Sequence, residues 1–342
     1  MPDPSAADRL TEADLALIDA LQSAPRAPWS SIAQATGTAA STAARRWERL
    51  RGDGLAWITA YESARSVVVA HVEVRCAAPE VTANAGRLAL LPWVVSVYEV
   101  AGDFDLLLTV GAADLPMLGR VLRDDVRALP GVTEARVRVT MTQYGEGGDW
   151  RMRALSKADR VRLPQRSRSG RVSYSDTGHD RHSEEDQHLL TVLGRDGRIG
   201  HRALGQELGV SEHTAARRLR RLLTDGGVVL RCDFAHRTAG LTASVVYRAA
   251  VPHAECDEVG SALARLEPVR LSVSVSGEDN LLVHALLHGL SGAEAFEASL
   301  RDRFPTLDVT ARTVVLRTVK RVGWMLDERE RAVSHVPPRP PA

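Results

Sequence analysis

A long internal repeat constrains the architecture of this chain more than any other feature. The string Thr-Ala-Ala-Arg-Arg occurs at residues 42–46 and again at 214–218, which defines a register of 172 residues (214 − 42). Further aligned pairs are Asp14 with Asp186, Arg26 with Arg198 and Leu50 with Leu222, followed at a register of 175 (277 − 102) by Gly102 with Gly277 and Pro130 with Pro305. Because self-similarity of this length decides the architecture before any local pattern, the chain is a fused pair of similar units.

The composition and charge of the chain narrow its class. A length of 342 residues with 44% hydrophobic residues predicts about two to three domains of a soluble globular protein. The formal net charge is only +1, but most of the positive charge is arginine and is clustered, so its distribution matters more than its sum. No apolar run approaches the ~20 residues that cross a bilayer, and the first ten residues lack a signal-peptide layout. We therefore expect no membrane association and a cytoplasmic location.

The sequence contains no pattern that predicts catalysis or metal binding. Cys76, Cys232 and Cys256 form no CxxC pair, which is typical of ordinary buried thiols. A phosphate loop, a nucleophile elbow and an HExxH motif are also absent from the sequence. We therefore expect no catalytic residues, no cofactor and no metal.

Each unit opens with a helical pattern, a polar break and a second short helix that ends at a glycine, Gly37 or Gly209. Thr38 or Ser211 then provides a hydroxyl that can cap a third helix, which contains the repeated string. Helix, turn and helix with a glycine at the turn is the supersecondary unit that reads DNA. The sequence therefore predicts two helix-turn-helix domains, at residues 8–63 and 183–238.

The rest of each unit alternates strands and helices. The expected elements of the first unit are strand 66–76, helix 79–90, strand 93–100, strand 105–110, helix 113–129 and strand 132–142, and the second unit repeats them between 241 and 317. This order predicts ferredoxin-like βαββαβ domains over 64–144 and 239–330, and an α+β fold class. Because the helices of such a domain cover one face of the sheet, the other face is free for self-association, either within the chain or with a second chain.

The segments outside the two units differ in composition. Residues 145–182 are rich in glycine, serine and arginine, which predicts a basic and partly flexible linker that either follows DNA phosphates or stays solvated. Its first part is expected to be ordered, because Trp150 corresponds to Trp324 at the end of the second unit. The proline-rich tail is expected to be disordered over 331–342.

The third helix of the second unit has two distinct faces. An apolar stripe from Ala215 to Leu222 predicts its buried side, and His213, Arg217 and Arg220 lie on the opposite side. Arginine pairs bidentately with guanine, and the other polar side chains bond base edges or phosphates. This face therefore predicts contact with the major groove of DNA.

The third helix of the first unit matches this pattern less well. Its outward row is Ser41, Arg45 and Glu48, and Glu48 stands at the position of Arg220. A carboxylate there faces phosphates unfavourably unless it accepts from a cytosine amino group. Either the two units read different half-sites or the first unit is the poorer DNA binder. The predicted DNA-contacting residues of both units are Ser41, Thr42, Arg45, Arg46, Arg49, Ser211, His213, Thr214, Arg217, Arg218, Arg220 and Arg221.

Taken together, these residues resemble the leucine-responsive/asparagine regulator (Lrp/AsnC) family, present twice. The second unit carries the family's recognition stretch nearly whole, from 209–211 (Gly-Val-Ser) to 226–228 (Gly-Gly-Val). In the first unit Ala39 stands where Ser211 does, so its helix cap departs from the family pattern.

The resemblance extends to the family's second module, the ferredoxin-like amino-acid-binding (RAM) domain. Residues 102–105 (Gly-Asp-Phe-Asp) match its glycine–acidic–aromatic–acidic turn, and 277–280 (Gly-Glu-Asp-Asn) keep the glycine and an acid. The resemblance implies a transcriptional regulator that binds double-stranded DNA, pairs through its RAM domains and binds a small effector, typically an amino acid. The effector-binding residues that it implies are Gly102, Asp103, Asp105, Gly277, Glu278, Asp279 and Asn280.

Two other functions stay open at the level of sequence. Sirohaem decarboxylases resemble the same family, but they need histidines around a tetrapyrrole. The histidines of this chain are scattered, at His71, His236, His253, His284 and His288. The spacing of the last two would suit a metal on a helix, but their segment is expected to be a strand running into a loop. The other alternative is a sensor or interaction protein without DNA binding, which Glu48 alone favours.

Overall fold

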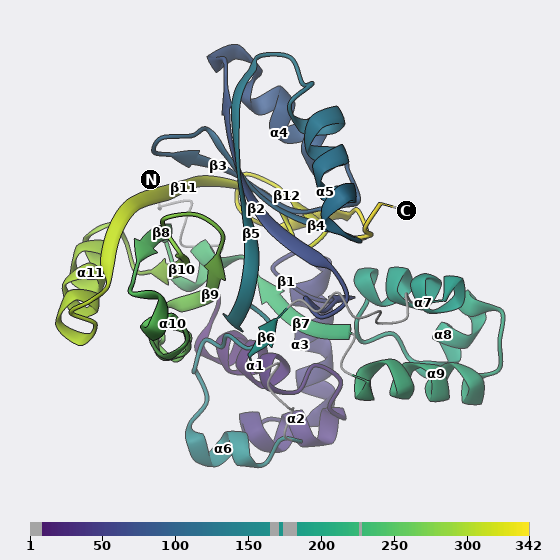
Figure 1. Cartoon of the computed structure of the whole chain (residues 1–342). Coiled ribbons are helices and arrows are strands. Elements are labelled where there is room, and N and C mark those ends of the chain that lie inside the picture. The colour runs from purple at the N-terminus through teal and green to yellow at the C-terminus, as the bar shows by residue number, and fades with distance from the viewer. Residues whose placement is uncertain (1–8, 165–170, 174–182, 226–227, 342) are drawn as a thin grey trace, which may run out of the picture.

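The structure is a computed structural model that describes residues 9–164, 171–173, 183–225 and 228–341. It consists of two α+β units related by the internal repeat, as the sequence predicts (Figure 1). The helical domains comprise α1 (Glu12–Ser23), α2 (Trp29–Thr36) and α3 (Ala40–Gly52) in the first unit, and α7 (Glu184–Arg195), α8 (His201–Leu208) and α9 (Glu212–Thr224) in the second. No helix within the described ranges is long and apolar enough to cross a membrane.

Local sequence signals set the ends of these helices. The hydroxyl of Thr11 accepts a hydrogen bond from the backbone N–H of Asp14 at 3.2 Å, and the Asp14 carboxylate accepts from the backbone of Thr11 in return. This reciprocal cap satisfies two donors at the start of α1 that have no partner within the helix. Gly37 and Gly209 end α2 and α8 with φ values of 66° and 64°, a left-handed conformation that glycine adopts readily.

The strands that follow the helical domains are not predicted from the sequence. β1 (Ala56–Glu62) of the first unit pairs antiparallel with β7 (Val228–Phe234) of the second unit, and we call this pair the β1–β7 ribbon. Helix α1 packs against β7, and α7 packs against β1. Each helical domain therefore packs on the strand of the other unit, and the two domains share one hydrophobic core.

Beyond the ribbon, each unit folds as a βαββαβ domain, which confirms the ferredoxin-like prediction. The first comprises β2 (Val68–Cys76), η2 (Ala78–Glu80), α4 (Val81–Ala89), β3 (Val94–Ala101), β4 (Leu106–Ala112), α5 (Leu115–Val121), η3 (Leu122–Val126) and β5 (Val132–Gly145). The second comprises η4 (His236–Ala239), β8 (Ala243–Ala250), η5 (His253–Glu255), α10 (Cys256–Leu263), β9 (Val269–Val275), β10 (Leu281–Leu287), α11 (Ser291–Arg303) and β11 (Asp308–Arg321). In each domain the helices cover one face of the sheet over a separate apolar core.

The two sheets join edge to edge into a closed ring of strands. β5 pairs with β9 of the other unit, β11 pairs with β3, and the strand order β11-β3-β4-β2-β5-β9-β10-β8 returns to β11. Tyr98 and Leu107 of the first unit meet Val246, Val273 and Leu282 of the second inside this ring. The free sheet faces therefore pair within one chain, and the closure removes the exposed strand edges that would otherwise invite another chain.

Part of the predicted linker is ordered. β5 runs to Gly145, Trp150 packs in the core shared by the helical domains, and α6 (Lys157–Val161) follows. Strand β6 (Val172–Ser173) pairs with β5. The other residues of the predicted linker, 165–170 and 174–182, lie outside the described residues, as do Gly226 and Gly227 of the family motif.

The tail differs from the disorder expected over 331–342. Strand β13 (Ala332–His335) pairs with β12 (Trp324–Leu326), and the backbone N–H of Ala332 donates to the Gly54 carbonyl at 2.8 Å. The N–H of Arg339 donates to the Pro92 carbonyl at 3.0 Å. These backbone hydrogen bonds hold the tail against the first unit. The proline-rich composition of the tail predicts disorder and gives no sign of them. Residue 342 lies outside the described residues.

Candidate functional site

Helix α9 presents the predicted DNA-contacting face of the second unit. It begins at Ser211, whose hydroxyl accepts a hydrogen bond from the backbone N–H of Thr214 at 3.2 Å. Its apolar stripe is buried, as the sequence predicts, and His213, Arg217 and Arg220 are exposed on the opposite side. The helix therefore has the cap, the buried face and the cationic exposed face that a recognition helix needs.

Two of the predicted DNA-contacting arginines join the third helix of their own domain to its first helix. In the second unit Arg221 lies 2.7 Å from both carboxylate oxygens of Asp186 in α7. In the first unit the aligned Arg49 lies 2.6 Å from Asp14 in α1. Burial alone raises the pKa of Asp14, but its hydrogen bonds with Thr11 and Arg49 outweigh burial and keep this pKa below its usual value. The alignment of the two aspartates in the repeat is the signal that points to these pairs.

The neighbouring arginines also turn toward the first helix of their domain. Arg218 lies 2.7 Å from the carboxylate of Glu185, and Arg46 lies 3.7 Å from that of Asp14. Both arginines are only partly exposed. The two arginines of each repeated Arg-Arg pair therefore have different environments. The second arginine contacts its own domain, whereas the first, Arg45 or Arg217, faces solvent.

The first unit differs from the second at the start of its third helix. The cap position is Ala39, which makes no side-chain hydrogen bond, and Thr38, offered by the sequence as a cap, lies 3.2 Å from the hydroxyl of Thr36 instead. Glu48 is exposed and forms an ion pair with Arg51 at 3.0 Å. This pair offsets part of the negative charge that Glu48 would present to DNA.

Three arginines on the two third helices have no competing partner. Within the described ranges, the side chains of Arg45, Arg217 and Arg220 form no ion pair or hydrogen bond, and all three are exposed. Of the twelve predicted DNA-contacting residues, these are therefore the cations that are available without breaking an existing contact. The second unit supplies two of them and the first unit supplies one.

The predicted effector turns are joined to neighbouring strands and to the other unit. Gly102 and Gly277 have φ values of 156° and 111°, as tight turns of this kind require. The Asp105 carboxylate accepts a hydrogen bond from the backbone N–H of Cys76 at 2.8 Å, and the aligned Asn280 accepts from Val251 at 3.0 Å. These two side chains therefore each join their turn to the end of a neighbouring strand.

The remaining turn carboxylates face arginines of the sheets. Asp103 lies 3.1 Å from Arg248 of the other unit, and Asp279 lies 3.3 Å from Arg138 of the other unit. Glu73 completes this interface charge cluster, at 3.4 Å from Arg138 and 3.5 Å from Arg248. Glu278 is exposed. The turns therefore join the two units through ion pairs.

The charge cluster also explains why the units pair with each other. Glu73 and Arg248 occupy the same position in the two repeats, since 73 + 175 = 248. Two identical units would bring like charges together at this position, whereas the fused pair brings a carboxylate to a guanidinium with side chains about nine-tenths buried.

Replacement of Glu73 by glutamine is expected to lower the free energy of unfolding by about 3 kcal/mol, because it removes the most buried carboxylate of the cluster and leaves Arg138 and Arg248 with one negative charge fewer. The measurement is chemical denaturation at pH 7. The matched control is Glu134→Gln, whose ion pair with Arg136 on the same sheet is largely exposed, so its loss should stay below about 1 kcal/mol. Equal losses in the two variants would contradict the role assigned to Glu73.

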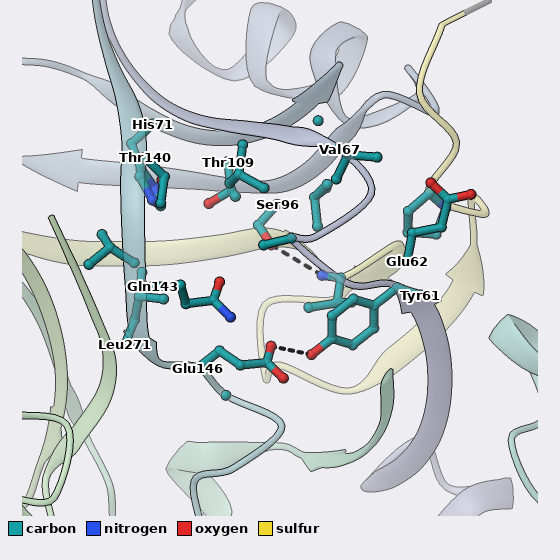
Figure 2. A pocket seen from close by; sticks show the side chains of 18 of the residues that line it. Tyr61, Glu62, Val67, His71, Ser96, Thr109, Thr140, Gln143, Glu146 and Leu271 are labelled. Carbon is teal, nitrogen blue, oxygen red and sulfur yellow. Dashed lines mark hydrogen bonds between the residues drawn. The ribbon is translucent and has the colours of Figure 1, made fainter. Parts of the chain in front are cut away.

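A cavity of about 150 Å³ lies between the strand ring and the β1–β7 ribbon. His71 and Thr140 line it from β2 and β5, and Tyr61 and Glu146 are hydrogen-bonded to each other at its other side (Figure 2). His284 lines it from β10. Burial lowers the pKa of His71 to about 4, so its imidazole is neutral at pH 7.

The histidines that are scattered in sequence are thus partly gathered by the fold. His71 and His284 line one cavity, although 213 residues separate them (284 − 71). His284 lies within strand β10, which confirms that its spacing from His288 is not helical. Among the residues that the structure describes, no group of histidine, cysteine, aspartate and glutamate is arranged to hold a metal. All three cysteines are buried and unpaired, as the sequence predicts.

Two helix-turn-helix domains joined to two ferredoxin-like domains place the chain, by its fold, in the class of helix-turn-helix proteins that carry a ferredoxin-like second module. Comparison with known families agrees with this class. The AsnC-type helix-turn-helix domain matches residues 10–51 and again 184–223, and the Lrp/AsnC ligand binding domain matches residues 69–150. These matches show Lrp/AsnC-type domains in this chain, and the structure repeats their architecture in the second unit.

Known proteins similar to this chain cover one unit or the whole. The HTH-type transcriptional regulator FL11 of Pyrococcus horikoshii is 29% identical over 141 residues, which is 40% of this chain and 93% of FL11. The HTH-type transcriptional regulator LysM of Saccharolobus solfataricus is 27% identical over 36% of this chain and 87% of LysM. Among solved structures, the siroheme decarboxylase NirDL in complex with an iron-uroporphyrin III analogue covers 91% of this chain and 93% of its own, with a TM-score of 0.58 and 17% identity. The last similarity concerns the tandem fold alone.

Proposed function

We propose that this chain is a sequence-specific DNA-binding transcriptional regulator in which one polypeptide replaces the dimer of single-unit relatives. The observation that carries the proposal is the set of exposed arginines on the two helix-turn-helix domains. The side chains of Arg45, Arg217 and Arg220 have no competing ion pair among the described residues. The names of the relatives FL11 and LysM support it. The regulator acts in the cytoplasm, and a small effector such as an amino acid binds in its ferredoxin-like half.

The fused architecture favours an asymmetric operator. Paired helices of this kind contact half-sites that lie about one helical turn, ~34 Å, or a multiple of it apart. The exposed row of α9 carries two arginines and a histidine, whereas that of α3 carries one arginine and the Glu48–Arg51 pair. Two identical chains could not differ in this way, so the two units are free to read different half-sites.

The proposal is tested by selection of bound DNA from a random pool with the purified full chain at moderate salt. Enrichment of a motif with two unequal half-sites is expected. A single enriched half-site would assign DNA reading to the second unit alone, and failure to enrich any sequence would reject the proposal. Affinity for non-specific DNA should also fall steeply as salt rises, because phosphate contacts release counter-ions, and a salt-independent affinity would favour the sensor alternative.

Replacement of Arg217 by alanine is expected to weaken operator binding by about 5- to 150-fold, because one bidentate arginine–guanine contact contributes roughly 1–3 kcal/mol. Arg45→Ala, the matched change in the first unit, should weaken binding less if the second unit dominates. Fluorescence anisotropy with the selected operator measures both. Arg123→Ala, an exposed arginine in the ferredoxin-like half, is the control and should leave the affinity unchanged. Equal losses in the two helix variants would argue against the asymmetry.

Two observations favour a tetrapyrrole-binding enzyme as the second candidate. His71 and His284 line the same cavity, and the tandem fold resembles that of a siroheme decarboxylase. The cavity volume of about 150 Å³ argues against it, because sites for drug-sized ligands occupy roughly 300–1,000 Å³. Titration with a ferric porphyrin separates the candidates: a shifted Soret band would favour the enzyme, and an unchanged spectrum would favour the regulator.

A further inference from the structure

We infer that the cavity between the strand ring and the β1–β7 ribbon is the effector site, and that its ligand is a small neutral molecule with one aromatic ring and one hydroxyl-type group. This inference rests on the proposed function for the regulatory role of the ligand, and it replaces the amino acid named there by a neutral molecule. Binding itself can be measured without DNA. The site differs from the family-type turns at 102–105 and 277–280, whose residues do not line the cavity.

The size of the cavity sets the size of the ligand. Its volume is about 150 Å³, and an apolar protein cavity of roughly that volume binds benzene. Most of its wall is apolar, with Val67, Val69 and Leu107 from the first unit and Leu271 and Leu282 from the second. Burial of a single ring against such a wall is favourable, because it removes apolar surface from water.

Two buried polar groups mark where a polar atom of the ligand would bind. His71 and Thr140 are only 4% and 7% exposed, and both line the cavity. The Nε2 atom of His71 and the hydroxyl of Thr140 have no hydrogen-bond partner among the described residues. A buried polar group without a hydrogen-bond partner destabilises the protein, and a ligand that forms this hydrogen bond removes that unfavourable free energy. A ligand hydroxyl can both donate and accept, so it can serve both groups.

The charges around the cavity favour a neutral ligand. Arg231 and Arg270 reach its wall, but both lie 2.7 Å from the Asp233 carboxylate and are already paired. Glu146 accepts a hydrogen bond from Tyr61. The imidazole of His71 is uncharged, because burial lowers its pKa to about 4. Arg339 of the tail also lines the cavity, and this residue is exposed. A carboxylate or ammonium group beside the buried His71 and Thr140 would have no dedicated counter-ion there, which is unfavourable.

The cavity is placed to act on the helical domains. Tyr61 of β1 and both Val229 and Arg231 of β7 contribute to its wall. These strands form the ribbon on which the two helical domains pack. A ligand in the cavity therefore contacts the ribbon that sets the spacing of α3 and α9. A ligand that binds one placement of the ribbon more tightly than another shifts the chain toward that placement, and this shift changes the affinity for DNA.

The test uses phenol as the probe and the full chain without DNA, in calorimetric titration. A dissociation constant on the order of 1 mM is expected, given about 0.6 kcal/mol per heavy atom for a ligand of this size. Thr140→Val should weaken phenol binding about three- to tenfold and leave benzene binding unchanged, because it removes one hydrogen bond at constant shape.

Gly111→Leu provides the blocked cavity. Gly111 lines the cavity, and a Cβ placed on it would meet only the Val95 side chain, at 3.9 Å, so a side chain can begin there without a backbone clash and is expected to occupy part of the cavity. Phenol binding should be lost in this variant while its thermal unfolding stays cooperative. Unchanged phenol binding in Gly111→Leu, or tighter binding of L-leucine than of phenol to the wild-type chain, would overturn the inference.

The DNA arm separates this inference from the proposed function. Saturating phenol is expected to change operator affinity in the wild-type chain and not in Gly111→Leu. If phenol binds in the cavity and the chain selects no DNA, the proposed function fails and the ligand site stands. If the chain selects an operator but phenol binds neither the wild-type chain nor Thr140→Val, the ligand site fails and the proposed function stands.

Discussion

Replacement of Asp233 by asparagine is expected to lower the free energy of unfolding by about 3–5 kcal/mol, the range found when one partner of a buried ion pair is removed. Asp233 is 1% exposed, and its carboxylate lies 2.7 Å from both Arg231 and Arg270. Arg321 lies 3.7 Å from the same carboxylate. An amide leaves these buried guanidinium groups with one negative charge fewer. Chemical denaturation at pH 7 measures the loss.

The same substitution should change how stability depends on pH. Burial opposes ionisation of Asp233, but the charges of Arg231 and Arg321 outweigh burial and lower its pKa far below the usual value. A carboxylate with a lowered pKa in the folded state stabilises the protein above its unfolded pKa of about 4, and this contribution is lost as pH falls toward the folded pKa. The difference in stability between the wild-type chain and Asp233→Asn should therefore be smaller at pH 2–3 than at pH 7.

The control for this prediction is Asp124→Asn. Asp124 is an exposed carboxylate that lies 3.0 Å from Arg123, so its loss should change the free energy of unfolding by less than about 1 kcal/mol. A loss for Asp233→Asn that is no larger than this, or a difference from wild type that is the same at both pH values, would show that the buried cluster is not the source of stability.

The parts of the fold that depend on local patterns are predicted well from the sequence. The glycines at 37 and 209 end their helices, and the six-element order of each ferredoxin-like domain is as expected. The β1–β7 ribbon is not predicted, because each of its strands finds its partner in the other unit, where the central pair, Thr59 and Arg231, lies 172 residues apart (231 − 59). A strand whose pairing exists only between the repeats leaves no hairpin or crossover signal in its own unit.

The candidate sites show the same division. Helical spacing separates the exposed row of α9 from its buried stripe, but spacing cannot reveal that Arg221 is taken by Asp186. The cavity is invisible in the sequence, because His71 and Thr140 meet only when the strand ring closes. The ordered tail is missed for a related reason, since its bonds to Gly54 and Pro92 depend on contacts far along the chain.

The second large effect is expected from the reciprocal arginines that join the helical domains. Arg26 donates to the carbonyls of Gly197 and Ile199 at 2.6 and 2.8 Å. The aligned Arg198 donates to the carbonyls of Pro25 and Ala27 at 2.6 and 2.9 Å. These charge-assisted bonds run from each unit to the other around the internal two-fold relation. Each contributes on the order of 1.5–3 kcal/mol where it is buried.

Arg198→Ala is expected to cost about 2–4 kcal/mol of stability, and Arg26→Ala slightly less. The difference arises because Arg198 also stacks 4.0 Å from the ring centre of Trp29, a contact of roughly 0.5–1 kcal/mol. Thermal and chemical denaturation measure both. Arg195→Ala, which removes an exposed arginine three residues away on α7, should have little effect. A larger loss for Arg195→Ala than for Arg198→Ala would contradict the assignment.

The double variant carries the sharper expectation. Burial, and then the charge of Arg26, lower the pKa of Arg198 to about 10, so the two cations repel each other. Each single substitution loses hydrogen bonds but also relieves that repulsion, whereas the second substitution of a pair has no repulsion left to relieve. The loss in Arg26→Ala/Arg198→Ala should therefore exceed the sum of the single losses, by roughly 0.5–1 kcal/mol for residues in contact.

Because the bonds connect the helical domains, the double variant should also bind an operator with two half-sites more weakly while a single half-site is bound as before. Unchanged discrimination between the two DNA sites would mean that the β1–β7 ribbon alone sets the spacing of the recognition helices.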